Sequence, residues 1–351
     1  MAAKGIASVG ECMIELSGGD AGQWRMGFAG DSFNTLWALR ALIDEATPAD
    51  YVSAFGDDPF SRDQIAFLAG AGIGTASSPI IAGARPGLYA ITLSGAERSF
   101  TYWRADAAAR RLADDPAALG KSLENRALVY FSGISLAILQ PDARQRLLAA
   151  LATARDRGAL IAFDPNYRPR LWPDAEAARA AIVEALGIVD IALPTFPDEQ
   201  ALFGDANLRP AAMRMAKAGV GEVVVKNGEE PALVWTDGVR DLVEAVQIPS
   251  PVDTTGAGDS FNGAYLAARL AGIGPVEAAQ KAHRVAAAVV QVHGALAPFE
   301  TLREAFGGSS YRVPNLKTRE AMAELERGEG KRFSNAEELF NDLDKPDADD
   351  R

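Results

Sequence analysis

Short apolar runs alternate with amphipathic helical patterns through the middle of the chain. The apolar runs predict strands at Ala127–Phe131, Leu160–Phe163, Ile188–Leu193 and Glu222–Val225. Apolar residues at helical spacing predict helices at Asp142–Arg157 and Asp174–Leu186. This alternation indicates an α/β fold in which helices cover both faces of a parallel sheet. Ligands of such sheets bind beyond the carboxyl ends of the strands, where this chain has Asp164, Asn166, Arg168, Thr195 and Lys226.

The N-terminal third carries a hairpin pattern. Two β-like runs, Leu88–Leu93 and Arg98–Trp103, are joined through Ser94–Glu97, in which a Gly-Ala pair suits a type II′ turn. A second hairpin is expected from Ala232–Trp235 to Leu242–Val246, with a turn at Asp237-Gly238.

The first hairpin has a polar face. A loop of two residues at Gly95-Ala96 pairs Tyr89 with Tyr102, and side-chain alternation then places Tyr89, Tyr102 and Arg104 on the same side. Two phenols and a guanidinium on one side favour a lid over a ligand. An edge hairpin with a solvated arginine and half-buried tyrosines is the alternative.

The segment Asp253–Phe261 carries the most chemical information. It opens a helix of small residues that runs to about Ala271, and free N–H groups at a helix start stabilise anions. Gly256 and Gly258 let an anion approach the backbone, and Asp259 in the first turn can accept a proton from an alcohol. An ordinary helix cap is the alternative, but it does not explain the whole Gly-Ala-Gly-Asp run.

The amino-acid composition excludes several classes of function and site. The 351 residues include 35 Lys and Arg against 47 Asp and Glu, a net charge of −12, which argues against a nucleic-acid partner. An anionic substrate therefore needs local basic residues. The single cysteine, Cys12, allows no internal disulfide, and two histidines make a multi-histidine metal site improbable. We expect a cytoplasmic protein, because the sequence also shows no signal peptide and no membrane-spanning run.

Two segments of the chain resemble the signatures of a known family. Asp253–Phe261 is similar to the C-terminal signature of the ribokinase-like (PfkB) carbohydrate kinases, and Ala29-Gly30-Asp31 with Asn34 is similar to their sugar-binding signature. Three further stretches resemble the 2-keto-3-deoxygluconate kinases of that family, namely Gly10–Leu16, Phe100–Arg104 and Phe163–Trp172. The resemblance covers residues 4 to 300.

The resemblance implies a ribokinase-like α/β fold, with a mainly parallel sheet sandwiched by helices and a small β lid. It places a kinase domain at residues 1–306, with lid strands from about 10–30 and 87–104, a linker at 307–312 and an appendage at 313–351.

The family's functional residues fall on definite positions of this chain. The catalytic base falls on Asp259 and the anion hole on Gly256, Ala257 and Gly258. The substrate-binding positions are Gly30, Asp31, Asn34, Tyr89, Tyr102, Arg104 and Arg168. The nucleotide-binding positions are Lys226, Gly228, Gly256 and Gly258, with the metal-region motif on Thr195 and Asp198, where the family usually has Asn and Glu.

The implied activity is ATP-dependent phosphorylation of 2-keto-3-deoxygluconate at its terminal hydroxyl. ATP and Mg²⁺ are the expected cofactors, while a monovalent cation and a homo-oligomer stay open. Another sugar, such as fructose, ribose, tagatose or ketodeoxygalactonate, is the alternative substrate. A serine hydrolase is a weaker alternative, because Gly133–Ala137 imitates a nucleophile elbow around Ser135, with His293 later in the chain.

The C-terminal end suggests a function of a different class. Gly307–Ser310 has the composition of a linker, and Val313–Met322 with Phe333–Leu343 resembles the toxin-binding end of RelB-type bacterial antitoxins. Apolar faces at helical spacing in this tail suit a protein partner, and a passive tail is the alternative.

Overall fold

The computed structural model describes residues 4–18, 23–94 and 97–307. The chain divides into two compact units, Met1–Ser309 and Ser310–Arg351, and every described residue belongs to the first. The expected turn at Gly95-Ala96 and the antitoxin-like tail lie outside the described residues.

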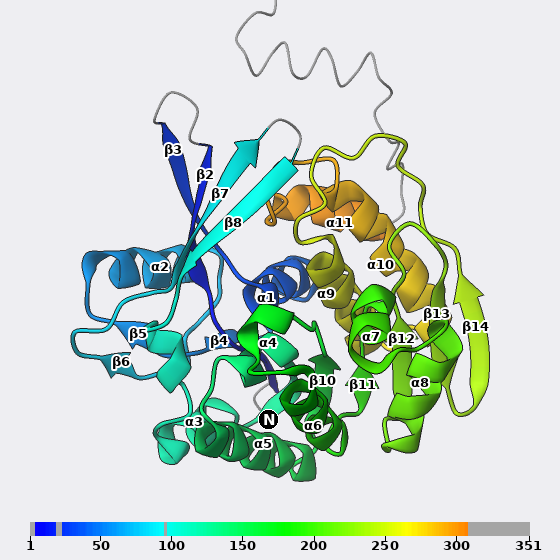
Figure 1. Ribbon diagram of the computed structural model, residues 1–351, viewed down its shortest axis with the longest axis horizontal. Coiled ribbons are helices and arrows are strands. Elements are labelled where there is room, and N and C mark those ends of the chain that lie inside the picture. The colour runs from blue at the N-terminus through cyan, green and yellow to red at the C-terminus, as the bar shows by residue number, and fades with distance from the viewer. Residues whose placement is uncertain (1–3, 19–22, 95–96, 308–351) are drawn as a thin grey trace, which may run out of the picture. The chain divides into compact units, whose positions relative to one another are not determined.

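An eight-stranded sheet forms the centre of the first unit (Figure 1). Its strand order is β14-β13-β12-β11-β10-β9-β1-β4, and the strands from β12 to β4 run parallel. The antiparallel strands β13 and β14 extend one edge. In chain order the strands are β1 (Gly5–Val9), β4 (Ala49–Val52), β9 (Arg126–Ser132), β10 (Leu160–Asp164), β11 (Ile191–Ala192), β12 (Glu222–Val225), β13 (Ala232–Thr236) and β14 (Val239–Val243).

Helices cover both faces of this sheet, as the alternating pattern predicts (Figure 1). The first group packs together through the contacts of α1 with α9 and α11 and consists of α1 (Asp31–Leu42), α9 (Ala257–Leu270), α10 (Pro275–Val289) and α11 (Phe299–Gly307). The second group shares one apolar core and consists of α3 (Pro116–Ser122), α5 (Pro141–Asp156), α6 (Ala175–Leu186) and α8 (Leu208–Lys217). In that core Phe131 of β9 and Phe163 of β10 have ring centroids 4.6 Å apart.

The remaining elements surround the carboxyl ends of the strands and the lid. They are α2 (Pro59–Gly70), α4 (Gly133–Ala137), α7 (Phe196–Phe203), the short paired strands β5 (Phe55–Gly56) and β6 (Ile80–Ile81), and two 3₁₀ turns at Ala108–Arg111 and Pro169–Leu171. Within the part of the chain that the structure describes, no helix has the length and apolarity to span a bilayer.

A separate four-stranded sheet forms the lid, in the order β3-β2-β7-β8 (Figure 1). Its strands are β2 (Met13–Gly18), β3 (Trp24–Ala29), β7 (Leu88–Ser94) and β8 (Glu97–Trp103). Tyr89 pairs with Tyr102 across β7 and β8, in the register that the two-residue loop predicts.

The expected strands and helices of the middle region are confirmed, with two differences in their bounds. The strand expected at Ile188–Leu193 is shorter, because only Ile191–Ala192 pairs with its neighbours. The second strand of the Asp237-Gly238 hairpin lies earlier than Leu242–Val246. Both turn residues have positive φ, and this tight turn makes Val239 the direct partner of Thr236.

Candidate active site

Helix α9 begins without a side-chain cap. Gly256 is its N-cap residue and has φ of +75°, a conformation that favours glycine. A Cβ at this position would lie 2.8 Å from the backbone oxygen of Ala295, so a larger residue does not fit. The first-turn N–H groups of α9, including those of Gly258 and Asp259, have no carbonyl partner inside the helix. The start of α9 therefore presents open N–H groups, which is the backbone arrangement that the expected anion site requires.

Asp259 meets the N-terminal signature through Asn34. The side-chain nitrogen of Asn34 donates to Oδ2 of Asp259 over 2.8 Å, and the Asn34 side-chain oxygen accepts from the N–H of Gly30 over 3.3 Å. Helices α1 and α9 approach closely because Gly263 has no side chain: a Cβ there would lie 2.4 Å from the backbone oxygen of Thr35. This packing brings the two signature segments together.

The surroundings of Asp259 disfavour its charged form. Desolvation and the nearby charge of Asp31 raise its pKa to about 7, although the hydrogen bond from Asn34 and the charge of Lys226 act in the opposite direction. A carboxyl group with a pKa near 7 can both accept and release a proton near neutral pH.

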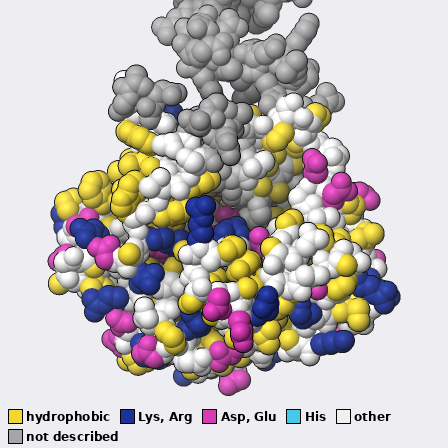
Figure 2. Space-filling model, viewed as in Figure 1, with side chains coloured by type: hydrophobic (Ala, Val, Ile, Leu, Met, Phe, Trp, Pro, Cys, Tyr) yellow, Lys and Arg dark blue, Asp and Glu magenta, His cyan; other side chains and the backbone are white. Residues whose placement is uncertain are grey.

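A large cavity lies between the lid and the start of α1. Its volume is about 1150 Å³, and Thr255 and Glu11 contribute to its wall. All the expected substrate-binding residues line it: Gly30, Asp31, Asn34, Tyr89, Tyr102, Arg104 and Arg168. Lys and Arg side chains gather near the middle of the face shown in Figure 2, although the chain as a whole is acidic.

The lid residues of this cavity are held by two acidic side chains. The hydroxyl of Tyr89 donates to Glu15, and the guanidinium of Arg104 donates to Glu11, which is almost fully buried. Burial raises the pKa of Glu11, and the charge of Arg104 opposes that rise. The rings of Tyr89 and Tyr102 lie 5.7 Å apart, so the two phenols and Arg104 form one wall as expected.

Arg168, which follows β10, also lines this cavity. Its guanidinium donates to Asp198 over 3.0 Å, and desolvation raises the pKa of Asp198, while the charge of Arg168 opposes that rise. The amide of Asn166 donates to Asp31 over 2.8 Å. Thus Asp198, expected in the metal-region motif, contacts a residue of the substrate group.

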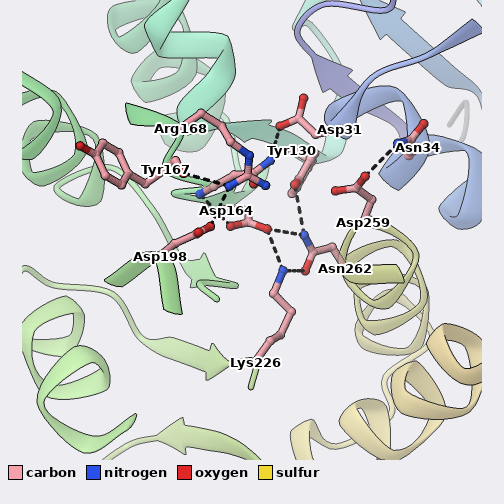
Figure 3. A network of polar contacts seen from close by, with 11 residues as sticks. Asp31, Asn34, Tyr130, Asp164, Tyr167, Arg168, Asp198, Lys226, Asp259 and Asn262 are labelled. Atoms are coloured by element: carbon pink, nitrogen blue, oxygen red, sulfur yellow. Dashed lines mark hydrogen bonds and ion pairs between the residues drawn. The ribbon is translucent and has the colours of Figure 1, made fainter. Parts of the chain in front are cut away.

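A buried polar network lies beside Asp31 and Asp259 (Figure 3). The Nζ of Lys226 lies 2.7 Å from Oδ2 of Asp164 and 2.9 Å from the side-chain oxygen of Asn262. Asn262 also donates to Asp164 over 2.8 Å and to the Tyr130 hydroxyl over 3.2 Å. Four segments that are distant in sequence therefore meet in this network.

A second cavity, of about 380 Å³, lies on the other side of the α9 N-terminus. Of the residues expected at the nucleotide and the anion hole, Thr195, Lys226, Gly228, Ala257 and Gly258 line it. The rest of its wall is mostly apolar and includes Val246, Ile248, Phe261, Ala286 and Val290. An apolar wall beside open N–H groups suits a ligand with an aromatic ring and a phosphate chain.

Ser135 does not form a nucleophile elbow. Its side chain is fully buried, and its hydroxyl donates to the backbone oxygen of Val9 over 2.7 Å. It also caps α4 together with Ser132. The hydrolase alternative is therefore wrong, because a nucleophilic hydroxyl must reach its substrate.

Four residues of the site act in ways that the sequence did not reveal, although Asp164 was expected near a ligand from its place after a strand. Glu11 and Glu15 hold the lid side chains, and Asp164 and Asn262 hold Lys226. The sequence did contain a sign of the role of Glu11 and Glu15, because both carboxylates lie beside buried residues of β2. Those carboxylates need partners in an otherwise apolar stretch.

Comparison with known proteins identifies the family of this chain. The family described as pfkB family carbohydrate kinase matches residues 3–302. The 2-dehydro-3-deoxygluconokinase of Dickeya dadantii (strain 3937) is 42% identical over 309 residues, which cover 86% of this chain and 99% of the relative.

Two solved structures have the same fold. The 2-dehydro-3-deoxygluconokinase of Thermotoga maritima superposes with a TM-score of 0.74 at 22% identity, covering 86% of this chain and 99% of its own. An Escherichia coli protein assigned as a ribokinase II, solved with ATP and Mg²⁺, gives 0.75 at 24% identity, covering 87% and 99%. With the signature residues gathered around α9 and a family match over most of its length, the chain belongs to the pfkB family of carbohydrate kinases.

Proposed function

We propose that the chain transfers the γ-phosphoryl group of ATP to the terminal hydroxyl of 2-keto-3-deoxygluconate, a compound also named 2-dehydro-3-deoxygluconate. The products are ADP, 2-keto-3-deoxy-6-phosphogluconate and a proton. The observation that carries the proposal is the position of Asp259. Its carboxylate accepts a hydrogen bond from Asn34, which lines the substrate cavity. It also lies in the first turn of α9, which carries the open N–H groups.

Asp259 acts as the proton acceptor in this scheme. The sugar hydroxyl attacks the γ-phosphorus, and its proton passes to the Asp259 carboxylate. Phosphoryl transfer proceeds through a loose transition state, so the proton leaves late and positioning with charge stabilisation contributes most. The N–H groups that follow Gly256 stabilise the charge on the transferred group.

The nucleotide-side cavity fits ATP. Its apolar wall suits the base, while Lys226 and the start of α9 suit the phosphates. Among the described residues no group of three Asp, Glu, His or Cys side chains is placed to hold a metal ion. We expect Mg²⁺ to arrive on the phosphates and to keep several waters. Thr195, which lines this cavity, and Asp198, which contacts Arg168, would be the protein's contribution. When bound, Mg²⁺ neutralises charge on the phosphate oxygens.

Two guanidinium groups favour a sugar acid over a neutral sugar. Arg104 and Arg168 line the same cavity from the lid and from the end of β10. A carboxylate substrate of an acidic protein needs such local cations, and arginine binds carboxylates through two parallel hydrogen bonds. The name of the Dickeya dadantii relative, at 42% identity, points to the same substrate.

A coupled assay of ADP release tests this proposal. The purified chain is offered ATP with 2-keto-3-deoxygluconate, ketodeoxygalactonate, fructose, ribose or tagatose. We expect the highest kcat/KM with 2-keto-3-deoxygluconate and a product phosphorylated at the terminal hydroxyl. A clear preference for a neutral sugar would contradict the assigned substrate, and no sugar-dependent ADP release would contradict the kinase function itself.

A further inference from the structure

Two hydrogen bonds fix the position of the Lys226 ammonium group. Its side chain is almost fully buried, and its ammonium contacts the Asp164 carboxylate at 2.7 Å and the Asn262 amide oxygen at 2.9 Å. An ammonium has three N–H donors, and these two bonds use two of them. In Figure 3 the Lys226 side chain points into the network that Asp164 and Asn262 form.

Asp164 and Asn262 make further hydrogen bonds within this network. Oδ1 of Asp164 accepts from the N–H of Asn166 over 3.0 Å, and Oδ2 accepts from both Lys226 and Asn262. The Asn262 amide nitrogen also reaches the Tyr130 hydroxyl. Asp164 ends β10, Lys226 follows β12 and Asn262 lies in α9, so the network joins the sheet to the helix that carries Asp259.

The held ammonium lies beside the start of α9. A Cβ at Gly258 would be 3.7 Å from Nζ of Lys226, and Lys226 lines the nucleotide-side cavity together with Ala257 and Gly258. A lysine on a flexible four-carbon stem loses conformational freedom when it binds a phosphate, unless the protein has already fixed it. A charge fixed in advance needs no reorganisation when negative charge develops.

We propose that Asp164 and Asn262 are positioning residues that hold the Lys226 ammonium next to Gly258, where it stabilises the phosphoryl group during transfer. This inference rests on the proposed kinase function. Asp164 supplies the counter-charge that a buried ammonium requires, and Asn262 fixes its direction from within α9. Neither residue contacts the reacting atoms, and both act through Lys226.

A double-mutant cycle tests this role. The variants are Asp164→Asn, Lys226→Met and the two together, measured for kcat and for both KM values. Each single change should lower kcat about ten- to a hundredfold, the effect of losing a hydrogen bond to a charged group. KM for the sugar should stay near that of the unchanged protein. The double variant should be no slower than Lys226→Met, because Asp164 has nothing left to position.

A matched control separates positioning from loss of stability. Asp50 and Arg126 form another largely buried ion pair, which joins β4 to β9 away from both cavities. Asp50→Asn should lower the unfolding temperature without lowering kcat. Asn262→Leu keeps the branching and the number of heavy atoms of the side chain, and it removes the amide while it leaves the Lys226–Asp164 ion pair. It provides a second variant for the cycle if Asp164→Asn does not fold.

Calorimetric binding of a non-hydrolysable ATP analogue with Mg²⁺ gives a second readout on the same variants. Losses of affinity that do not add in the double variant would support the positioning role. If the unchanged protein phosphorylates none of the sugars offered, that result contradicts the proposed function but leaves this binding test valid. Losses that simply multiply in the double variant, in kcat and in affinity, would overturn the inference. So would a kcat for Asp164→Asn equal to that of the unchanged protein.

Discussion

Asn34 and Asp259 are separated by 225 positions in the sequence, yet the Asn34 amide donates to the Asp259 carboxylate over 2.8 Å. Asn34 belongs to the helix that begins at the sugar-side cavity, and Asp259 to the first turn of the helix that borders the nucleotide-side cavity. This hydrogen bond therefore holds the Asp259 carboxylate between the two cavities, where the proposed mechanism needs a proton acceptor.

The pH dependence of kcat/KM should report the state of Asp259 in the free enzyme. Its pKa is about 7, raised mainly by desolvation and then by Asp31. Only the carboxylate form accepts the proton, so kcat/KM should fall as the pH decreases through about 7 and level off above it. Asp31→Asn removes a charge that raises the pKa, so the midpoint should move to lower pH. A midpoint unchanged in that variant would contradict this assignment.

Arg168→Ala should weaken the binding of a sugar acid selectively. The loss should correspond to about 1.5–3 kcal/mol, the range for hydrogen bonds to charged groups, seen as a higher KM for the sugar acid. Arg155→Ala is the control, because Arg155 pairs with Asp190 on the surface, 2.9 Å away, and does not line the cavity. Equal increases in KM for the sugar acid and for ATP would mean that Arg168 does not recognise the carboxylate.

Gly256→Ala should damage both stability and activity, whereas Gly272→Ala should cost only stability. Both glycines have φ near +75°, so a side chain is strained at either position by about 1 kcal/mol. Only at Gly256 would the added Cβ lie within 3 Å of Ala295, while the space at Gly272 is open. Thermal unfolding and kcat measured on both variants check this, and equal kcat values would argue against an anion site at Gly256.

Removal of the tail should leave the kinase intact. Truncation after Gly308 keeps α11, whose Phe299 ring lies 4.6 Å from Trp37 of α1. Truncation after Pro298 removes that contact and should destabilise the protein by several kcal/mol, as deletion of buried aromatic side chains does. Unfolding temperature and kcat of the two shortened chains provide the measurement. Loss of folding after the first truncation would show that the tail is part of the kinase unit.

The parts of the fold that depend on local patterns were predictable from the sequence. Strand β12 follows from the apolar run Glu222–Val225, and the Tyr89–Tyr102 pair follows from the length of the loop between two β-like runs. The start of α9 follows from the glycines at 256 and 258. Each of these depends on neighbouring residues only.

The contacts that complete the site depend on distant residues and were not predictable from one sequence. Glu11 reaches Arg104 across 93 positions, and Lys226 reaches Asp164 across 62. Several acids could have satisfied each of these cations, and the choice follows from the packing of strands and helices. For the same reason Asp198, three positions after Thr195 in the motif, contacts Arg168.

The most direct test of the account is the kcat of Asp259→Asn with ATP and 2-keto-3-deoxygluconate, together with the affinity for a non-hydrolysable ATP analogue. The substitution removes the proton acceptor but keeps the first-turn N–H groups of α9. We predict that kcat falls by about 10²- to 10⁴-fold, the usual contribution of a general base, while the affinity for the analogue changes little. A kcat close to that of the unchanged protein would contradict the account.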